Sequence, residues 1–269
     1  MFGFALIHWS ADPEIFRIGP VVLRWYSLCF LVTFVLGYFI MRRMFRLEEK
    51  SAKDLDSLVN HMVLGTLIGA RLGHCLFYDP VFYLTNPIEI FKIWRGGLAS
   101  HGAAIGIFAA LYLYARNRPD QSYLWILDRI VVTVALGGFF IRIGNFFNSE
   151  IYGIPTDLPW AVVFSHVDAV PRHPAQLYES LAYGLIFVFL YAVCSKLRAR
   201  TPPGLLLGLF LVTVFSFRVV VEFVKVRQAA YGHGFPLSVG QWLSVPLILM
   251  GIVLLVNALR DNRSTASIK

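Results

Sequence analysis

Residues 204–224 read GLLLGLFLVTVFSFRVVVEFV, an apolar run that contains one arginine, Arg218, and one glutamate, Glu222. An α-helix needs about 20 apolar residues to cross the hydrocarbon core of a bilayer. A guanidinium keeps its proton in proteins, so an arginine inside such a helix must find a partner there. This stretch therefore predicts a membrane helix that also carries a polar site.

The rest of the chain has the same character. It holds 269 residues, of which 57% are hydrophobic and only 15% are charged, whereas soluble domains carry roughly 25% charged residues. We expect an all-α membrane protein, one integral domain over residues 1–269 with seven transmembrane helices. Residues 148–174 are polar and proline-containing and are expected to form a small extracytoplasmic cap, in which 158–164 has strand composition. The expected spans are 21–41, 55–78, 97–115, 124–147, 175–194, 204–224 and 238–259.

The basic residues indicate an orientation. With the N-terminus outside, the inner loops and the C-terminal tail hold thirteen of the 24 lysines and arginines, and the outer segments hold seven. The positive-inside rule then places the C-terminus in the cytoplasm. The basic residues that give the chain its net charge of +8 then face the anionic lipids of the cytoplasmic leaflet. No nucleic-acid partner is therefore expected.

Four arginines lie inside the expected spans: Arg71, Arg129, Arg142 and Arg218. In this topology all but Arg129 lie near the outer face, where an anionic lipid headgroup is a candidate partner. Arg129 is expected to be an interfacial anchor that snorkels to water beside Asp128. Glycines repeat every four residues in 65–73 and in 102–106, which is typical of closely packed membrane helices.

The outer end of span 124–147 carries a polar set. Arg142, Asn145 and Ser149 share one helical face. Glu150 joins that face only if the helix ends near Phe147. We therefore expect a polar cluster at this helix end.

A second arginine is expected in the same leaflet. Arg218 and Glu222 are four residues apart and can pair, either as a structural ion pair or as part of a site. Two guanidiniums can clamp one phosphate through forked hydrogen bonds. His101 lies at an expected helix start near the same face and is a candidate base, although a membrane histidine can also be merely hydrogen-bonded.

The string GGFFIRIGNFFNSEIYG, residues 137–153, closely resembles the signature of the prolipoprotein diacylglyceryl transferase family, G-G-x-x-x-R-x-G-N-F-x-N-x-E-x-x-G. Every fixed position of that signature matches. The resemblance extends to LRWYSL, GARLGHCLFYD, WRGGLASHGA, RHPAQLYE and FRVVVEF, and so spans nearly the whole chain. It implies a seven-span enzyme of the bacterial inner membrane, with its active site toward the extracytoplasmic leaflet.

The resemblance also implies a reaction. The diacylglyceryl group of phosphatidylglycerol moves to the lipobox cysteine thiol of a prolipoprotein signal peptide, and glycerol phosphate leaves; no metal or cofactor is expected. By correspondence with the family's motifs, the catalytic residues are His101, Arg142 and Arg218. The substrate-binding residues are Arg142, Arg218, Tyr26, Asn145, Glu150, Gly153 and Glu222. The chain departs from the family's motif at one position: Val214 stands four residues before Arg218, where the family has a tyrosine. Either the role of that tyrosine is dispensable, or a neighbour such as Tyr178 could share it.

Two other function classes stay open on the residues alone. A transporter or lipid flippase would also use intramembrane charges, but it needs polar residues along a path through both leaflets. A lipid-binding scaffold without turnover would use the same arginines and leave His101 idle. Transfer of labelled phosphatidylglycerol lipid to a lipobox peptide separates these classes.

Overall fold

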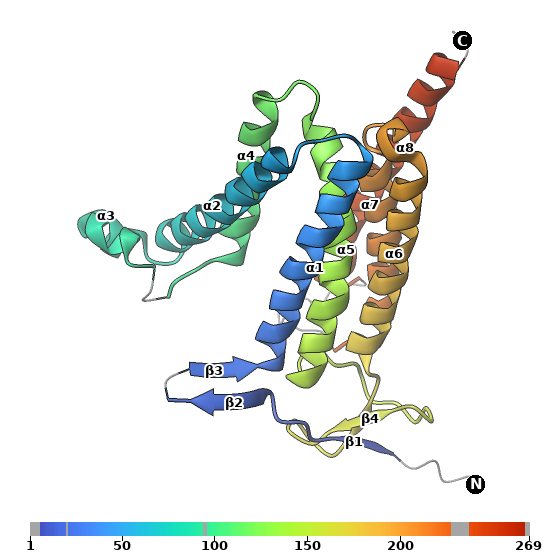
Figure 1. Cartoon of the computed structure of the whole chain (residues 1–269). Helices are drawn as coiled ribbons and strands as arrows, with labels where there is room; N and C mark the ends of the chain where they lie inside the picture. Colours follow the sequence, from blue (N-terminus) through green and yellow to red (C-terminus); the bar gives the residue numbers. More distant parts are fainter. Residues whose placement is uncertain (1–5, 20, 94–95, 227–236, 267–269) are drawn as a thin grey trace. The chain divides into compact units, whose positions relative to one another are not determined.

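The protein is described from a computed structural model, which covers residues 6–19, 21–93, 96–226 and 237–266 (Figure 1). The chain divides into two compact units. The first unit comprises Met1–Met44 and Asp128–Lys269, and the second comprises Phe45–Leu127. Long helices occupy all seven of the ranges in which the sequence predicts spans.

The first unit is built from long apolar helices. Helix α6 packs against α7, and α7 packs against α8. Among the described residues, five helices are long and apolar enough to cross a membrane; two of them, α1 and α5, run across the boundary of the unit. They are α1 (Trp25–Leu47), α5 (Tyr123–Phe147), α6 (Ala175–Leu197), α7 (Leu205–Val221) and α8 (Val239–Ala266).

The second unit is a pair of helices joined by two short turns of helix. Its members are α2 (Ala52–Phe77), α3 (Pro80–Thr85), the 3₁₀ helix η1 (Pro87–Phe91) and α4 (Ser100–Arg116). Helices α2 and α4 meet at their glycines, and a Cβ atom on Gly69 would lie 2.4 Å from the carbonyl oxygen of Gly102. No side chain fits there, which confirms the packing role predicted for these glycines.

Helices α2 and α4 differ from the five apolar helices. The first turns of α2 carry polar residues such as Lys53, Asp54 and Asn60. Helix α4 has 17 residues, which gives about 26 Å at 1.5 Å per residue, against about 30 Å of hydrocarbon. The crossing of the membrane by these two helices therefore stays a prediction.

Short strands form a cap on the first unit. Strand β4 (Val162–Phe164) pairs in parallel with β1 (Ile7–Trp9) and antiparallel with β5 (Pro171–Arg172). The strand composition noted in 158–164 thus forms β4. The Trp9 ring lies 4.4 Å from the ring of Phe146 at the end of α5, so the sheet is anchored on a helix end by aromatic packing.

A second pair of strands precedes α1. Strands β2 (Glu14–Ile18) and β3 (Val21–Arg24) form an antiparallel hairpin that leads directly into the helix. Within the first unit, Figure 1 shows β1 and β4 at the end where α5 stops and α6 starts, and the last turns of α8 at the opposite end. Strand β1 and the last turns of α8 thus lie at opposite ends of this unit.

The prediction for Arg129 is wrong. Its side chain is fully buried, at 0% exposure, instead of reaching water. The neighbouring carboxylate of Asp128 accepts the backbone N–H groups of Gly204 (2.7 Å) and Leu207 (2.8 Å), which begin α7. Arg129 lies 3.8 Å from this carboxylate. The free N–H groups at the start of a helix need acceptors, and the buried carboxylate of Asp128 accepts two of them at the start of α7.

Arg71 has its partners within the protein. The side chain is buried, and its guanidinium donates hydrogen bonds to the carbonyl oxygens of Ile90 (2.7 Å), Gly96 (2.7 Å), Gly97 (3.1 Å) and Glu89 (2.5 Å). Five N–H donors in a planar fork suit such a set of carbonyl groups. Arg71 therefore fixes the loop between η1 and α4, and a lipid headgroup is not needed as its partner.

Candidate active site

The site is built around the C-terminal end of α5. The helix ends at Phe147, and the chain turns back through Ser149 (φ 55°) and Ile151 (φ 57°). Positive φ is uncommon for residues other than glycine, and such strain often marks functional sites. The turn lets the backbone N–H of Glu150 bond to the carbonyl oxygen of Asn145 at 2.9 Å. The condition under which Glu150 joins the polar set, a helix that ends near Phe147, is met.

Arg142, Asn145 and Glu150 form one network. Arg142 Nη1 donates to Asn145 Oδ1 at 3.1 Å, and Asn145 Nδ2 donates to Glu150 Oε2 at 3.1 Å. Asn148 Nδ2 lies 3.3 Å from the other oxygen of Glu150, and Gln176 Nε2 donates to the Glu150 carbonyl at 2.6 Å. The buried amide of Asn145 thus points its oxygen at a cation and its nitrogen at an anion, as its two ends require.

Glu179 on α6 is the main ionic partner of Arg142. Its side chain is 1% exposed, and its Oε2 atom lies 3.0 Å from Arg142 Nε. Its other oxygen lies 3.4 Å from the ammonium of Lys225. A buried carboxylate between two cations avoids the desolvation cost of a lone buried charge. Glu179 therefore ties the end of α5 to the segment that follows α7.

The predicted pair of Arg218 and Glu222 does not form. Helix α7 ends at Val221, and Glu222–Val224 continue as the 3₁₀ turn η4, so the spacing of an α-helix no longer sets the direction of Glu222. Its carboxylate lies 3.7 Å from the ammonium of Lys225 and faces α8, where a Cβ on Gly240 would lie 3.0 Å from Glu222 Oε1. Within the described chain, Arg218 is half-buried and has no carboxylate as ionic partner.

Tyr183 is a further polar residue of this region. It lies on α6 one turn beyond Glu179, and its side chain is buried. The hydroxyl lies within the electrostatic reach of Arg142, Arg218 and Glu179. Its ring packs on Gly138, where a Cβ would lie 2.7 Å from Tyr183 Cδ2. Sequence reasoning missed Tyr183; its spacing of four residues from Glu179 is the signal that could have found it.

Tyr26 also belongs to this cluster. It is the second residue of α1, and its ring lies against Gly144, where a Cβ would be 2.8 Å from Tyr26 Cδ2. The hydroxyl lies within the electrostatic reach of Glu150 and Arg142. The structure thus brings Tyr26 together with the polar network of α5, as the site prediction requires.

Gly153 connects the cap to the end of η4. It is buried, and its backbone N–H donates to the carbonyl oxygen of His173 at 2.9 Å. A Cβ at this position would lie 2.5 Å from the carbonyl oxygen of Val224, so only glycine fits this close approach. The next residue, Ile154, bonds through its N–H to Val224 at 2.9 Å, which holds Lys225 in place. Contact of Gly153 with substrate stays a prediction.

The cap beside the site contains an ion pair of its own. Arg172 Nη2 lies 2.6 Å from Asp168 Oδ2, and this hydrogen bond holds the pKa of the Asp168 carboxyl below its usual value. The Arg172 guanidinium also lies 5.1 Å from the centre of the Tyr152 ring. Nearby, partial burial lowers the pKa of His173, which favours its neutral form.

His101 belongs to the second unit. It is the second residue of α4 and is exposed. The start of this helix is fixed on α2, because the N–H of Ala99 donates to the carbonyl oxygen of Ala70 at 2.9 Å. The arginine cluster belongs to the first unit, so the role of His101 in the same site stays a prediction. Among the described residues, no three His, Cys, Asp or Glu side chains are arranged to hold a metal ion.

Comparison with known proteins decides the family. The family described as prolipoprotein diacylglyceryl transferase matches residues 13–257 of this chain. The chain belongs to the prolipoprotein diacylglyceryl transferase family. The resemblance predicted from residues 137–153 is confirmed.

Curated relatives of this diacylglyceryl transferase family match along nearly the full chain. Each of the following is named phosphatidylglycerol–prolipoprotein diacylglyceryl transferase. The protein from Chloroherpeton thalassium is 51% identical over 95% of this chain and 95% of its own. The one from Tolumonas auensis is 46% identical over 95% and 99%, and the one from Porphyromonas gingivalis is 40% identical over 96% of each.

Proposed function

We propose that this protein transfers the diacylglyceryl group of phosphatidylglycerol to the lipobox cysteine thiol of a prolipoprotein and releases glycerol phosphate. Family membership supports the reaction class. The observation that carries the assignment of the site is the Arg142 guanidinium, held at the end of α5 by Glu179 (3.0 Å) and Asn145 (3.1 Å), with Arg218 half-buried in the last turn of α7. Permanent positive charge at the end of membrane helices is suited to a lipid phosphate.

The proposal includes a setting in the membrane. The chain would cross the bacterial inner membrane seven times, with its N-terminus outside and its C-terminus in the cytoplasm. The five apolar helices and the bias in lysine and arginine support this topology. Residues 148–174 and β1 would form the extracytoplasmic cap, so that Arg142 and Arg218 lie in the outer leaflet. Phosphatidylglycerol would then enter sideways from that leaflet.

The reaction is a displacement at carbon. The cysteine sulfur would attack the carbon of the diacylglyceryl group that bears the phosphate. A carbon–sulfur bond forms, and the carbon–oxygen bond to the phosphate breaks with its electron pair. Glycerol phosphate leaves with one more negative charge than the phosphodiester carried. Arg142 and Arg218 would stabilise that developing charge, and their effect is larger in a dry site than in water.

The nucleophile must lose a proton. A free cysteine thiol has a pKa of about 8.5, and only the thiolate attacks efficiently. His101 would take this proton as general base, and the nearby guanidiniums would favour the thiolate. The imidazole would then release this proton to water.

The remaining residues would hold the arginines. Glu179 and Asn145 contact the Arg142 side chain directly, and Glu150 orients Asn145. Arg218 has no carboxylate as ionic partner in the described chain, so we assign it the closest contact with the phosphate. Glu222 would act through Lys225, 3.7 Å away, instead of pairing with Arg218. Tyr26 and Gly153 would line the same site.

A transfer assay tests the function. The purified protein is supplied with phosphatidylglycerol labelled in its acyl chains and with a peptide that contains a lipobox cysteine. We expect label on the peptide and an equal amount of released glycerol phosphate, and no transfer to a peptide with serine in place of cysteine. If the protein binds the lipid but no label appears on the peptide, the protein is a lipid-binding scaffold and the proposed enzymatic function is wrong.

A further inference from the structure

The polar turn that follows α5 is held from α6 by one buried amide, that of Gln176. This residue lies in the first turn of α6, and its side chain is 0% exposed. Its Nε2 donates to the backbone carbonyl oxygen of Glu150 at 2.6 Å. Both residues belong to the first unit. The bond therefore joins the start of one long helix to the turn that ends another.

The turn needs such a contact because its backbone is strained. Ser149 (φ 55°) and Ile151 (φ 57°) flank Glu150 on its two sides. A left-handed backbone is unfavourable for residues that carry a Cβ atom, and it persists only where the surrounding structure fixes it. The Glu150 carbonyl lies between the two strained residues. The bond from Gln176 therefore acts at the centre of the strained turn.

The turn sets the direction of the Glu150 side chain, and hydrogen bonds carry that direction to Arg142. Glu150 Oε2 accepts from Asn145 Nδ2 at 3.1 Å, and Asn145 Oδ1 accepts from Arg142 Nη1 at 3.1 Å. Helix α6 also holds the other end of this network. Glu179 follows Gln176 by three residues on the same helix face, and its Oε2 lies 3.0 Å from Arg142 Nε. One face of α6 thus holds both the turn and the guanidinium.

The start of α6 is itself fixed beside the turn by backbone hydrogen bonds. The N–H of Gly153 donates to the carbonyl oxygen of His173 at 2.9 Å, and the N–H of His173 donates to that of Ile154 at 3.1 Å. Side chains on such rigid elements keep their geometry better than side chains on free loops. Gln176 is therefore placed to fix the turn.

The chemistry of Gln176 shows which of its atoms matters. The Glu150 carbonyl needs a donor, so the amide nitrogen faces it. The amide oxygen is then left buried, without a hydrogen-bond partner in the described chain. Such an oxygen costs free energy, and an apolar side chain of the same length would avoid that cost. The donor nitrogen is therefore the atom that explains a glutamine at this position.

We propose that Gln176 is a positioning residue of the transfer reaction. This role rests on the proposed function, in which Arg142 stabilises the charge that develops on the leaving phosphate. By fixing the Glu150 carbonyl, Gln176 fixes the direction of the Glu150 carboxylate. The carboxylate orients Asn145, and Asn145 orients the Arg142 guanidinium. Gln176 acts through these residues, without contact with the lipid or the thiol.

Single-turnover transfer by the full chain tests this role. Gln176→Met keeps the length of the side chain and removes the donor. We expect the rate to fall by at least about tenfold, because a misplacement of about 1 Å remote from the chemistry can cost on the order of a hundredfold. Thermal unfolding should stay close to that of the wild type, since the unpartnered buried oxygen is removed together with the donor. Gln176→Glu, which presents only acceptors when ionised, should lose the rate in the same way. A wild-type rate in both variants would overturn the role.

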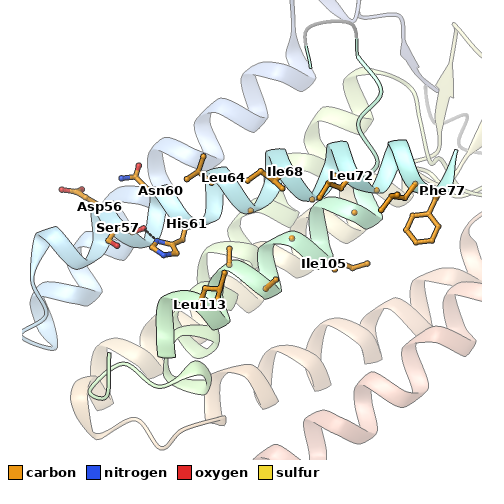
Figure 2. A pocket seen from close by; sticks show the side chains of 18 of the residues that line it. Asp56, Ser57, Asn60, His61, Leu64, Ile68, Leu72, Phe77, Ile105 and Leu113 are labelled. Carbon is orange, nitrogen blue, oxygen red and sulfur yellow. Dashed lines mark hydrogen bonds between the residues drawn. The ribbon is translucent and has the colours of Figure 1, made fainter. Parts of the chain in front are cut away.

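Two control variants separate this contact from a general loss of packing or of an amide. Ser180→Ala removes a hydrogen bond of 3.1 Å from Ser180 Oγ to the Phe139 carbonyl, which joins the same two helices away from the turn. Asn60→Met removes an exposed amide of α2, which Figure 2 shows in the second unit. Both controls should transfer at the wild-type rate. A loss in Ser180→Ala as large as that in Gln176→Met would overturn the role, because any weakened contact between α5 and α6 would then suffice.

A double-mutant cycle shows whether Gln176 acts through Glu150. The effects of residues in one hydrogen-bonded network do not add. Once Glu150→Ala has removed the carboxylate, Gln176→Met should therefore lower the rate no further. A purely structural effect on the amount of folded protein would lower the rate by the same factor in both backgrounds. That result would overturn the role.

Hydrogen exchange keeps this role separate from the proposed function. The N–H of Glu150 bonds to the Asn145 carbonyl at 2.9 Å, so Gln176→Met should speed exchange in 148–153 several-fold, and Ser180→Ala should not. Transfer by the wild type with an unchanged rate in Gln176→Met would reject the positioning role alone. A wild-type protein that transfers no lipid, while Gln176→Met still speeds exchange, would reject the proposed function and leave only the hold on the turn.

Discussion

At the scale of single residues, the site depends on a buried carboxylate shared by two cations. Glu179 lies 3.0 Å from Arg142 and 3.4 Å from Lys225, and it is 1% exposed. This arrangement holds the Arg142 guanidinium through Nε, which lies 3.0 Å from Glu179, and through Nη1, which donates to the Asn145 amide at 3.1 Å. The remaining donors can face a lipid phosphate. Arg218 differs because it has no such anionic partner there.

We predict that Glu179→Gln lowers both stability and the rate of transfer. The change leaves the partly buried Arg142 without its carboxylate and leaves Lys225 with Glu222 alone. Breaking a buried pair costs roughly 3–5 kcal/mol. Thermal unfolding in detergent and the transfer assay measure the two effects. The double variant Glu179→Gln with Lys225→Met removes one stranded cation and should recover part of the stability. If the single variant unfolds like the wild type, the carboxylate does not hold the cluster.

His101 gives a second prediction at this scale. A neutral imidazole accepts the thiol proton, and a protonated one does not. His101→Gln should therefore slow transfer and also flatten the fall of the wild-type rate at acidic pH. The pH profile of single-turnover transfer measures both. A variant with the wild-type rate and profile would show that His101 is not the base.

At the scale of elements, the ends of helices decide which side chains meet. The end of α5 at Phe147 could be foreseen from the polar NSE sequence and from Pro155 beyond it, and it brought Glu150 to Asn145 as expected. The end of α7 at Val221 has no glycine or proline to mark it. For that reason the sequence predicted a continuous helix there and paired Glu222 with Arg218 wrongly.

Contacts between elements were the other source of error. Glu179 ends the polar string RHPAQLYE at the start of α6, but its pairing with Arg142 depends on how α5 and α6 pack. Arg129 was expected in water, whereas Asp128 beside it caps the start of α7 from within the unit. Local patterns such as apolar length and glycine spacing therefore predicted helices and their close approach, and tertiary pairs could not be read from them.

The cap provides a prediction for its strands. Arg172 lowers the pKa of Asp168, so the ion pair stabilises the cap above the ordinary carboxyl pKa, near 3.9. Its contribution is lost only as the pH falls through the lower value of the folded state. Asp168→Asn should speed hydrogen exchange in 162–172 at neutral pH, after correction for intrinsic rates. Asp157→Asn, an exposed change in the same cap, should leave exchange unchanged; equal effects of both would contradict the role of the pair.

At the scale of the whole molecule, the ends of α5 and α7 that carry the arginines must face outward for Arg142 and Arg218 to bind a lipid of the outer leaflet. We predict that alkaline phosphatase is active when fused after Asp157, and that green fluorescent protein fluoresces when fused after Asn117 or at the C-terminus. The reason is the excess of lysine and arginine on the expected cytoplasmic side. Active phosphatase at Asn117 would reverse the topology.

The central claim is that two guanidiniums bind the phosphate that leaves. Lysine keeps the charge but loses the planar fork, so the most direct measurement is the single-turnover rate of transfer from phosphatidylglycerol in Arg142→Lys and Arg218→Lys. We predict that each rate falls by at least about a hundredfold, the loss typical of removing one donor to a developing charge, while thermal unfolding of Arg218→Lys stays close to that of the wild type. Rates near wild type in both variants would contradict the account.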